Sequence, residues 1–183
     1  DPQSLLDTLA YNQRVLARLR ALPMPVIAAV NGVAVAGGLE MILACDVVVA
    51  AETAKIGDGH ARYAIVPAAG STVQLLTRMH GVQAMHMLFS AELFPARQCM
   101  EWGLVNEVVE PERLHDRVQE IASQYSQQSP AVLRHMKVLT RTVHDDTVRA
   151  GLRAELGAFQ IHLKSRDLAE GLAAFREKRR PDY

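Results

Sequence analysis

The 183-residue sequence contains only two cysteines, Cys45 and Cys99, too few for the disulfide framework of a small secreted domain. Both lie in apolar stretches, so we interpret them as buried thiols in a reducing compartment, the cytoplasm or an organelle matrix. Basic and acidic side chains number 20 each, so no excess positive charge is available to attract nucleic acid or an anionic membrane. No apolar run approaches the roughly 20 residues of a membrane span. We therefore expect neither a nucleic-acid nor a membrane partner.

Several motifs of known chemistry are also absent. Gly32 and Gly37 have the spacing of a phosphate-binding loop, but Gly38 stands where that loop needs a lysine. There is no GxGxxG, GxSxG or HExxH segment. The seven histidines are scattered, and His80 and His86 do not share a helix face. We therefore expect no nucleoside triphosphate site and no metal site.

The first part of the chain has the pattern of an α/β fold. The composition, 49% hydrophobic and 22% charged, is ample for a buried core. Short β-branched apolar runs predict strands, and the continuous run at 26–30 predicts a strand buried on both faces. Further strands are predicted at 33–36, 47–50, 55–57 and 104–109, and helices at 5–22, 39–43 and in three short pieces between 71 and 103.

After Pro111 the pattern is helical almost to the end. Breaks at Ser129–Pro130 and Ser165 divide it, and the predicted helices are 112–127, 130–143, 147–163 and 167–176. We therefore divide the chain into an α/β part, residues 1–109, and a helical region, residues 110–183. The helical region is rich in apolar residues that a short core cannot all cover, so we expect an oligomer. These residues include Leu133, Met136, Val138, Leu139, Leu152, Leu156 and Phe159.

The segment Gly37–Glu40 carries the clearest chemical signal. Two glycines after an apolar run permit a tight strand-to-helix turn. Backbone N–H groups at a helix start lack partners within the helix, carry partial positive charge and can stabilise an oxyanion. Glu40 follows among apolar neighbours, and a buried carboxyl group has a raised pKa that suits acid–base chemistry near neutral pH. The alternative is a first-turn glutamate that only complements the helix dipole.

Several segments, in the same order, resemble the crotonase (enoyl-CoA hydratase/isomerase) superfamily. The matching segments are Pro25–Gly32, Ala36–Glu40, Cys45–Asp46, Ala54–Gly57, Ile65–Ser71, Ala96–Val105 and Asp167–Arg179. In Ile65–Ser71, alanine replaces one glycine of the family's Pro-Gly-x-Gly turn. Because these matches occur in the family's order over nearly the whole chain, they are specific to this superfamily.

The resemblance implies a fold and a substrate class. The family's fold is a spiral of ββα turns, followed by helices that build homotrimers, often paired into hexamers. Its substrates are acyl-CoA thioesters, so coenzyme A enters with the substrate and no other cofactor is implied. Two N–H groups hold the thioester oxygen; Gly37 matches the second, and the first comes from a segment that precedes the residues matched here. We therefore expect this chain to correspond to a crotonase that lacks its N-terminal portion.

The resemblance also implies site residues and shows two departures. Glu40 matches the first catalytic glutamate of the hydratases, whereas the second falls at His60. Neutral imidazole could orient a water molecule or relay a proton, unless His60 is a loop residue with no role. Asp58 is a further candidate nearby. An isomerase acid would fall near Ala68, which cannot ionise.

Three further residues match positions that contact substrate. They are Gly38, Pro67 and Lys178, and Lys178 is expected near a CoA phosphate unless it belongs to a solvated basic tail. The predicted function is an enoyl-CoA hydratase that adds water across a 2-enoyl-CoA double bond. The alternatives are an enoyl-CoA isomerase or an acyl-CoA hydrolase of the same fold, and a non-catalytic crotonase-like scaffold.

Overall fold

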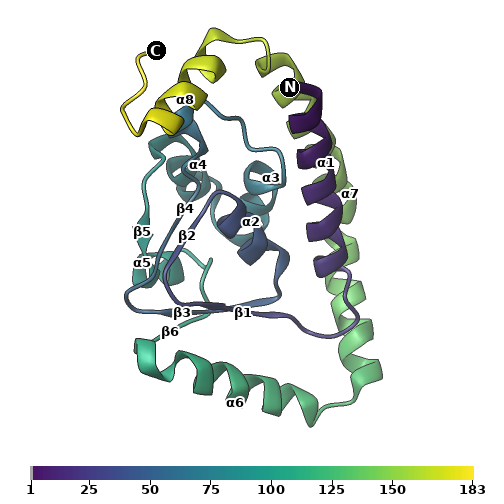
Figure 1. The fold of residues 1–183 in the computed structure, drawn as a ribbon. Helices are drawn as coiled ribbons and strands as arrows, with labels where there is room; N and C mark the ends of the chain where they lie inside the picture. The colour runs from purple at the N-terminus through teal and green to yellow at the C-terminus, as the bar shows by residue number, and fades with distance from the viewer. Residues whose placement is uncertain (1) are drawn as a thin grey trace.

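A computed structural model describes the backbone of residues 2–183 and the side chains of residues 4–142 and 147–183. Strands alternate with helices in the first part of the chain, and helices form the rest (Figure 1). The first part consists of α1 (Pro2–Arg20), β1 (Ile27–Val30), β2 (Val33–Val35), α2 (Gly37–Ala44), β3 (Val47–Ala51), β4 (Lys55–Gly57), η1 (His60–Tyr63), α3 (Ser71–Arg78), α4 (Gly81–Ser90), β5 (Phe94–Pro95), α5 (Ala96–Glu101) and β6 (Glu107–Val109). The rest consists of η2 (Pro111–Arg113), α6 (Leu114–Ser126), α7 (Pro130–His162) and α8 (Arg166–Glu177).

The strands form two small sheets. One has the order β1-β3-β6 and is parallel, with Ala28 opposite Val48. The other has the order β2-β4-β5, in which β2 and β4 are parallel and β4 and β5 are antiparallel. In the first sheet, β1 and β3 are each followed directly by a strand of the second sheet, β2 and β4 respectively. Helix α2 follows β2 and leads the chain back to β3 (Figure 1).

Two strand predictions need correction. β3 lies in the middle of its sheet and is buried, as expected, but β1 is an edge strand in which Ala29 is exposed. The strand predicted at 104–109 is shorter, because the N–H groups of Leu104 and Val105 donate to the Cys99 carbonyl, at 2.9 and 3.3 Å. These bonds close the turn after α5, and the strand begins only at residue 107.

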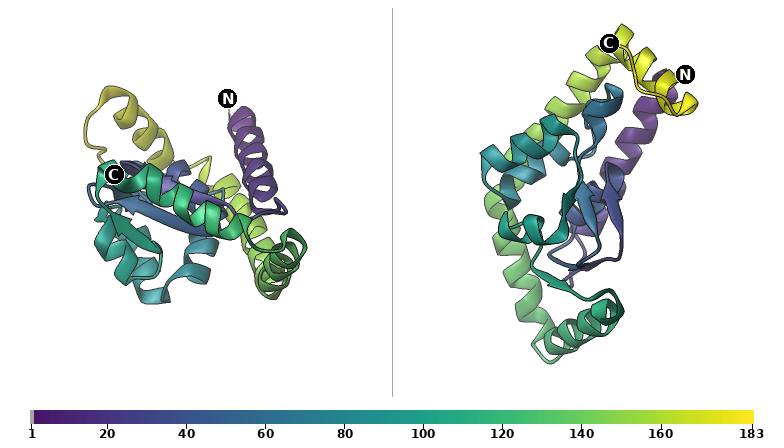
Figure 2. Two further views of the ribbon diagram at one scale, coloured as in Figure 1. Left: turned by 90° about the horizontal axis from the view of Figure 1, so that it is seen from below. Right: turned by 90° about the vertical axis from the view of Figure 1, so that its left-hand side faces the viewer.

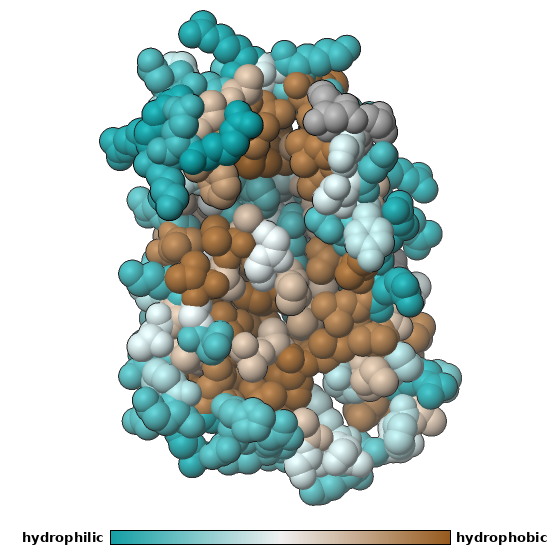
Figure 3. Space-filling model, in the orientation of Figure 1, coloured by the Kyte–Doolittle hydropathy of each residue, from teal (hydrophilic) through white to brown (hydrophobic). Residues whose placement is uncertain are grey.

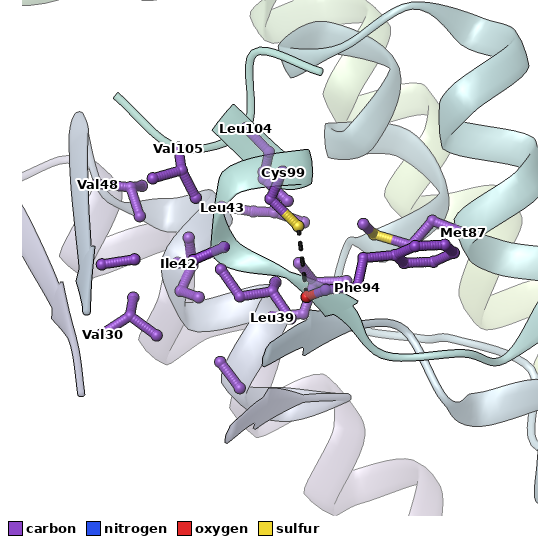
Figure 4. Packing of buried hydrophobic residues seen from close by; sticks show 14 of the residues in the cluster. Val30, Leu39, Ile42, Leu43, Val48, Met87, Phe94, Cys99, Leu104 and Val105 are labelled. Atoms are coloured by element: carbon purple, nitrogen blue, oxygen red, sulfur yellow. Dashed lines mark hydrogen bonds between the residues drawn. The ribbon is translucent and has the colours of Figure 1, made fainter. Parts of the chain in front are cut away.

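The core packs around α2. Leu39, Ile42 and Leu43 of this helix are buried against the strands and α5 (Figure 4). Cys99 is fully buried, and its thiol contacts the Phe94 carbonyl at 3.9 Å. Burial raises the pKa of Cys99 to about 12, so the thiol stays protonated and unreactive. Cys45 is also buried and free, which confirms the interpretation of both cysteines as buried thiols.

The helical region packs on the α/β part. α6 lies against β1 and β3, α7 runs along α3 and α1, and α8 covers η1 (Figures 1 and 2). Helix α7 is continuous over 33 residues, whereas the sequence predicted two helices divided near residue 145. No glycine or proline lies between residues 131 and 150, so nothing there interrupts the helix. The breaks at Ser129 and Ser165 are confirmed, since both side chains cap the helices that follow.

Apolar side chains remain on the surface. They gather across the middle of the face seen in Figure 1 (Figure 3). On α7, Met136, Val138 and Leu139 are exposed, whereas Phe159 is only 1% exposed and is covered by the chain itself. None of the described helices combines the length and apolar character needed to cross a bilayer.

Candidate active site

Glu40 lies in the first turn of α2, at the junction with β2. Ala36, the residue before the first residue of α2, has a positive φ of 51°, and its N–H donates to the Asp58 carbonyl at 3.0 Å. This sharp turn directs the start of α2 towards the loop after β4. The Glu40 side chain is 5% exposed, and its Oε1 accepts hydrogen bonds from the Ala69 N–H at 3.0 Å and the Ser71 hydroxyl at 3.4 Å. The carboxyl group is therefore buried and held in one orientation.

Burial raises the pKa of Glu40, because it disfavours the ionised form. The positive charge of His60 and the Ala69 N–H act in the opposite direction, and the charge of Asp58 raises the pKa further. A carboxyl group whose pKa is raised is a better proton acceptor, when ionised, than a solvated first-turn glutamate. The burial and fixed orientation of Glu40 are what the acid–base prediction requires, and its role stays a prediction.

The two glycines before Glu40 leave the helix start open. Gly37 is exposed, and a side chain built on it would meet nothing within 4 Å. At Gly38 a Cβ atom would make only an ordinary 3.7 Å contact with Ala34. The fold therefore does not itself require glycine at Gly37, and the free space lies beside the N–H groups that have no partner within α2. A thioester oxygen can approach the backbone there.

Asp58 and His60 form a second polar unit. Asp58 is 1% exposed; its Oδ1 lies 2.9 Å from His60 Nδ1, and its Oδ2 accepts the His60 N–H at 3.2 Å. An acceptor at Nδ1 places the proton of the neutral imidazole on that nitrogen, which leaves Nε2 with a free lone pair. Burial lowers the pKa of His60, but the hydrogen bond and charge of Asp58 and the charge of Glu40 outweigh it, so the pKa is raised. The charges of His60, Asp58 and Glu40 thus influence one another.

The C-terminal helix holds the loop that carries His60. Gly171 of α8 lies so close to Tyr63 that an added Cβ would be 1.9 Å from the Tyr63 carbonyl oxygen. The Tyr63 and Phe175 rings are in edge-on contact, with centroids 5.1 Å apart. The Tyr183 hydroxyl also donates to the Arg62 carbonyl at 3.0 Å. The position of His60 therefore depends on residues more than 100 positions further along the chain.

Glu155 of α7 is an acid that the sequence analysis missed. It is 5% exposed, and its Oε1 accepts hydrogen bonds from the N–H group and the hydroxyl of Thr72. Burial, with the nearby charge of Glu40, raises the pKa of Glu155 to about 7. One signal was available: Glu155 lies on the same helical stripe as Val148, Leu152 and Phe159, where a carboxyl group is unexpected.

Pro67 and Lys178 are placed differently relative to Glu40. Pro67 lies in the segment after η1, two residues before the Ala69 N–H that binds Glu40. Lys178, just after α8, lines a separate open pocket of about 1260 Å³ together with Arg62, Phe175 and Arg180. Neither Glu40 nor His60 lines that pocket. Within the part of the chain that the structure describes, no group of three or more histidine, cysteine or acidic residues could hold a metal ion.

The chain is similar to known proteins over most of its length. A family model described as enoyl-CoA hydratase/isomerase matches residues 7–183. The chain belongs to this family. It is 36% identical over 167 residues to the 2,3-dehydroadipyl-CoA hydratase of Escherichia coli, covering 91% of this chain and 66% of that protein. It is 33% identical to the crotonyl-CoA hydratase of Syntrophomonas wolfei, covering 95% of this chain and 67% of that protein.

The fold agrees with that of solved family members. A crystal structure of an enoyl-CoA hydratase from Mycobacterium avium subsp. paratuberculosis superposes with a TM-score of 0.91 at 27% identity, covering 97% of this chain and 73% of that one. The predicted α/β crotonase-like core followed by C-terminal helices is therefore confirmed. The chain spans from about half to about two thirds of the length of the curated relatives it matches.

Proposed function

We propose that this crotonase-family protein acts on acyl-CoA thioesters and hydrates a 2-enoyl-CoA. The observation that carries the proposal is the buried Glu40 carboxyl group. It lies three residues after Gly37, an exposed residue at the start of α2, and close to the Asp58–His60 pair. Together these groups offer an oxyanion donor, a positioned acid–base group and a hydrogen-bond acceptor. Relatives named as hydratases of CoA esters support this reaction class.

The reaction balances with one carboxylate. Ionised Glu40 takes a proton from water as the water oxygen bonds to C3, and the electron pair of the double bond moves to the thioester oxygen. The Gly37 N–H stabilises the resulting enolate. Glu40 then returns the proton to C2, which restores the carboxylate. His60 accepts a hydrogen bond from the attacking water at Nε2, because Asp58 holds the proton on Nδ1.

The remaining residues fit substrate binding. Gly38 permits the acyl chain to pass close to the backbone, and Pro67 shapes the segment that carries Ala69. Lys178 lies in a pocket lined by several cations, which suits the phosphates of coenzyme A. No other cofactor takes part in this scheme. Two free, buried cysteines suit a reducing compartment, for which we propose the cytoplasm or an organelle matrix.

A direct assay tests the function. Purified protein is mixed with crotonyl-CoA, and the loss of the conjugated absorbance is followed and matched to formation of 3-hydroxybutyryl-CoA. A 3-enoyl-CoA and a saturated acyl-CoA are run alongside, to detect isomerisation and thioester hydrolysis. Hydration as the fastest reaction supports the proposal. A shifted double bond or free CoA as the main product would replace it, and binding without turnover would indicate a scaffold.

The pH dependence of turnover tests His60. If its neutral form accepts the water hydrogen bond, turnover falls as the imidazole gains a proton. Because Asp58 and Glu40 raise the pKa of His60, the fall on the acid side should occur above the ordinary value of about 6.5. His60→Ala should remove this fall on the acid side of the pH profile and lower kcat. His60→Glu tests whether a carboxylate can take over the function of the imidazole. A pH profile of turnover that is unchanged in His60→Ala would show that His60 has no role in the reaction.

The exposed apolar residues of α7 predict an oligomer, and we propose a homotrimer or a pair of trimers. Light scattering at micromolar concentration should give a mass of at least three chains, because Met136, Val138 and Leu139 are each more than half exposed in the single chain. Replacing Val138 and Leu139 by serine should lower that mass without unfolding the protein. A monomer in the unchanged protein would contradict the prediction.

A further inference from the structure

Glu40 and Glu155 both accept hydrogen bonds from one short segment. The Ala69 N–H and the Ser71 hydroxyl donate to Glu40, and both donors of the next residue, Thr72, bind Glu155. Helix α7 brings Glu155 to this place because it packs along α3, which begins at Ser71. Residues 69–72, which we term the carboxylate turn, therefore donate to two carboxyl groups, each 5% exposed.

The second oxygen of Glu155 is buried, and the Gly70 backbone is a further neutral group that favours the ionised form of this carboxyl group. Oε2 is buried and makes no hydrogen bond among the described residues, whereas Oε1 binds Thr72. The donors at Oε1 are neutral. From α1, the Gln13 amide donates to the Ala68 carbonyl at 2.6 Å, and the Arg20 guanidinium donates to the Gln74 side chain of α3 at 2.6 Å. Glu40 of α2 and His60 of η1 both interact electrostatically with Glu155. A buried carboxyl group beside another carboxylate favours its neutral form.

We propose that Glu155 is a positioning residue of this active site, which fixes the carboxylate turn against Glu40 and, in its protonated form, keeps a second negative charge away from the enolate. The proposal rests on the proposed function for its effect on turnover. With Glu155 neutral, Glu40 is the ionised member of the pair and is ready to take a proton from water. When Glu155 ionises, its charge raises the pKa of Glu40 and opposes the developing oxyanion. The raised pKa of Glu155, about 7, places this change near neutrality.

Direct titration tests the pair without any assay of activity. The protein is labelled with ¹³C at the glutamate carboxyl carbons, and the Glu155 resonance is assigned by its loss in Glu155→Gln. Its midpoint should lie near pH 7. Glu40→Gln should lower this midpoint, because a negative charge is removed, and Thr72→Val should raise it, because a hydrogen bond to the ionised form is lost. Glu110→Gln, at an exposed position, should leave it unchanged.

Kinetics test the role in turnover. Glu155→Gln keeps an acceptor for Thr72 but cannot ionise, so kcat below pH 6 should stay within a few-fold and the decline above pH 7 should disappear. Glu155→Ala leaves the Thr72 donors free and should lower kcat at every pH, by up to about 10²-fold if Glu40 is displaced by an ångström. KM should change little in both variants.

The outcomes separate the two proposals. If no substrate is hydrated but the titration shifts appear with the expected signs, the coupled pair stands and the hydratase proposal fails. If hydration depends on Glu40 but Glu155→Gln and Glu155→Ala both keep the normal kcat and pH profile, Glu155 has no positioning role. A Glu155 midpoint near the ordinary value of about 4.3 that does not respond to Glu40→Gln would also overturn the inference.

Discussion

Replacing Glu40 by glutamine should lower kcat for crotonyl-CoA by about 10²–10⁴-fold, the usual cost of losing a positioned acid–base group. The amide has almost the same shape and can still accept the hydrogen bonds from Ala69 and Ser71. It cannot exchange a proton at neutral pH, so the loss should fall on turnover and leave KM within a few-fold. Steady-state kinetics on Glu40→Gln and the unchanged protein, at matched oligomeric state, measure the effects on kcat and KM separately.

Two controls make this result specific. Glu110→Gln removes an equal charge at an exposed position and should leave kcat unchanged. Thermal unfolding of Glu40→Gln should show a melting temperature equal to or above that of the unchanged protein, because a buried group that resists ionisation is replaced by a neutral one. A kcat equal to that of the unchanged protein would remove Glu40 from the mechanism and restore the helix-dipole interpretation.

The part of the site that the sequence predicted is local. Gly37, Gly38 and Glu40 lie within one strand-to-helix turn, so backbone chemistry and the apolar neighbours of Glu40 were enough to indicate both the open N–H groups and the burial. The Asp58–His60 contact also joins residues two positions apart. For the same reason, the strands at β2, β3 and β4 and the helix breaks at Ser129 and Ser165 could be identified from short stretches of sequence.

The part that the sequence did not predict depends on contacts between distant segments. Glu155 and Thr72 are 83 positions apart, and only the packing of α7 along α3 brings them together. β1 was expected to be buried because its residues are apolar, but burial of an edge strand depends on what covers it. The sequence analysis divided α7 near residue 145, although no glycine or proline lies between residues 131 and 150 and the helix continues through this stretch.

The contact between α8 and η1 gives the second large effect. Gly171→Ala should destabilise the protein and also lower turnover, because the new Cβ would meet the Tyr63 carbonyl oxygen at 1.9 Å. Both partners are backbone, so either α8 or η1 must move. Overpacking of this kind costs about 1–3 kcal/mol. In a chain of this size about 1 kcal/mol shifts the melting temperature by ~2–4 °C, so a drop of several degrees is expected by calorimetry.

A matched glycine separates this steric effect from helix propensity. Gly157 lies in α7, and a Cβ added there meets nothing within 4 Å, so Gly157→Ala should leave turnover unchanged and stabilise the protein by up to about 1 kcal/mol. For Gly171→Ala the opposite sign is expected, together with a lower kcat, because η1 begins at His60 and its displacement moves the imidazole relative to Glu40. A Gly171→Ala variant with an unchanged melting temperature would show that α8 does not bear on the loop. If it melts lower but keeps its kcat and the acid limb of its pH profile, the contact stabilises the fold without positioning His60.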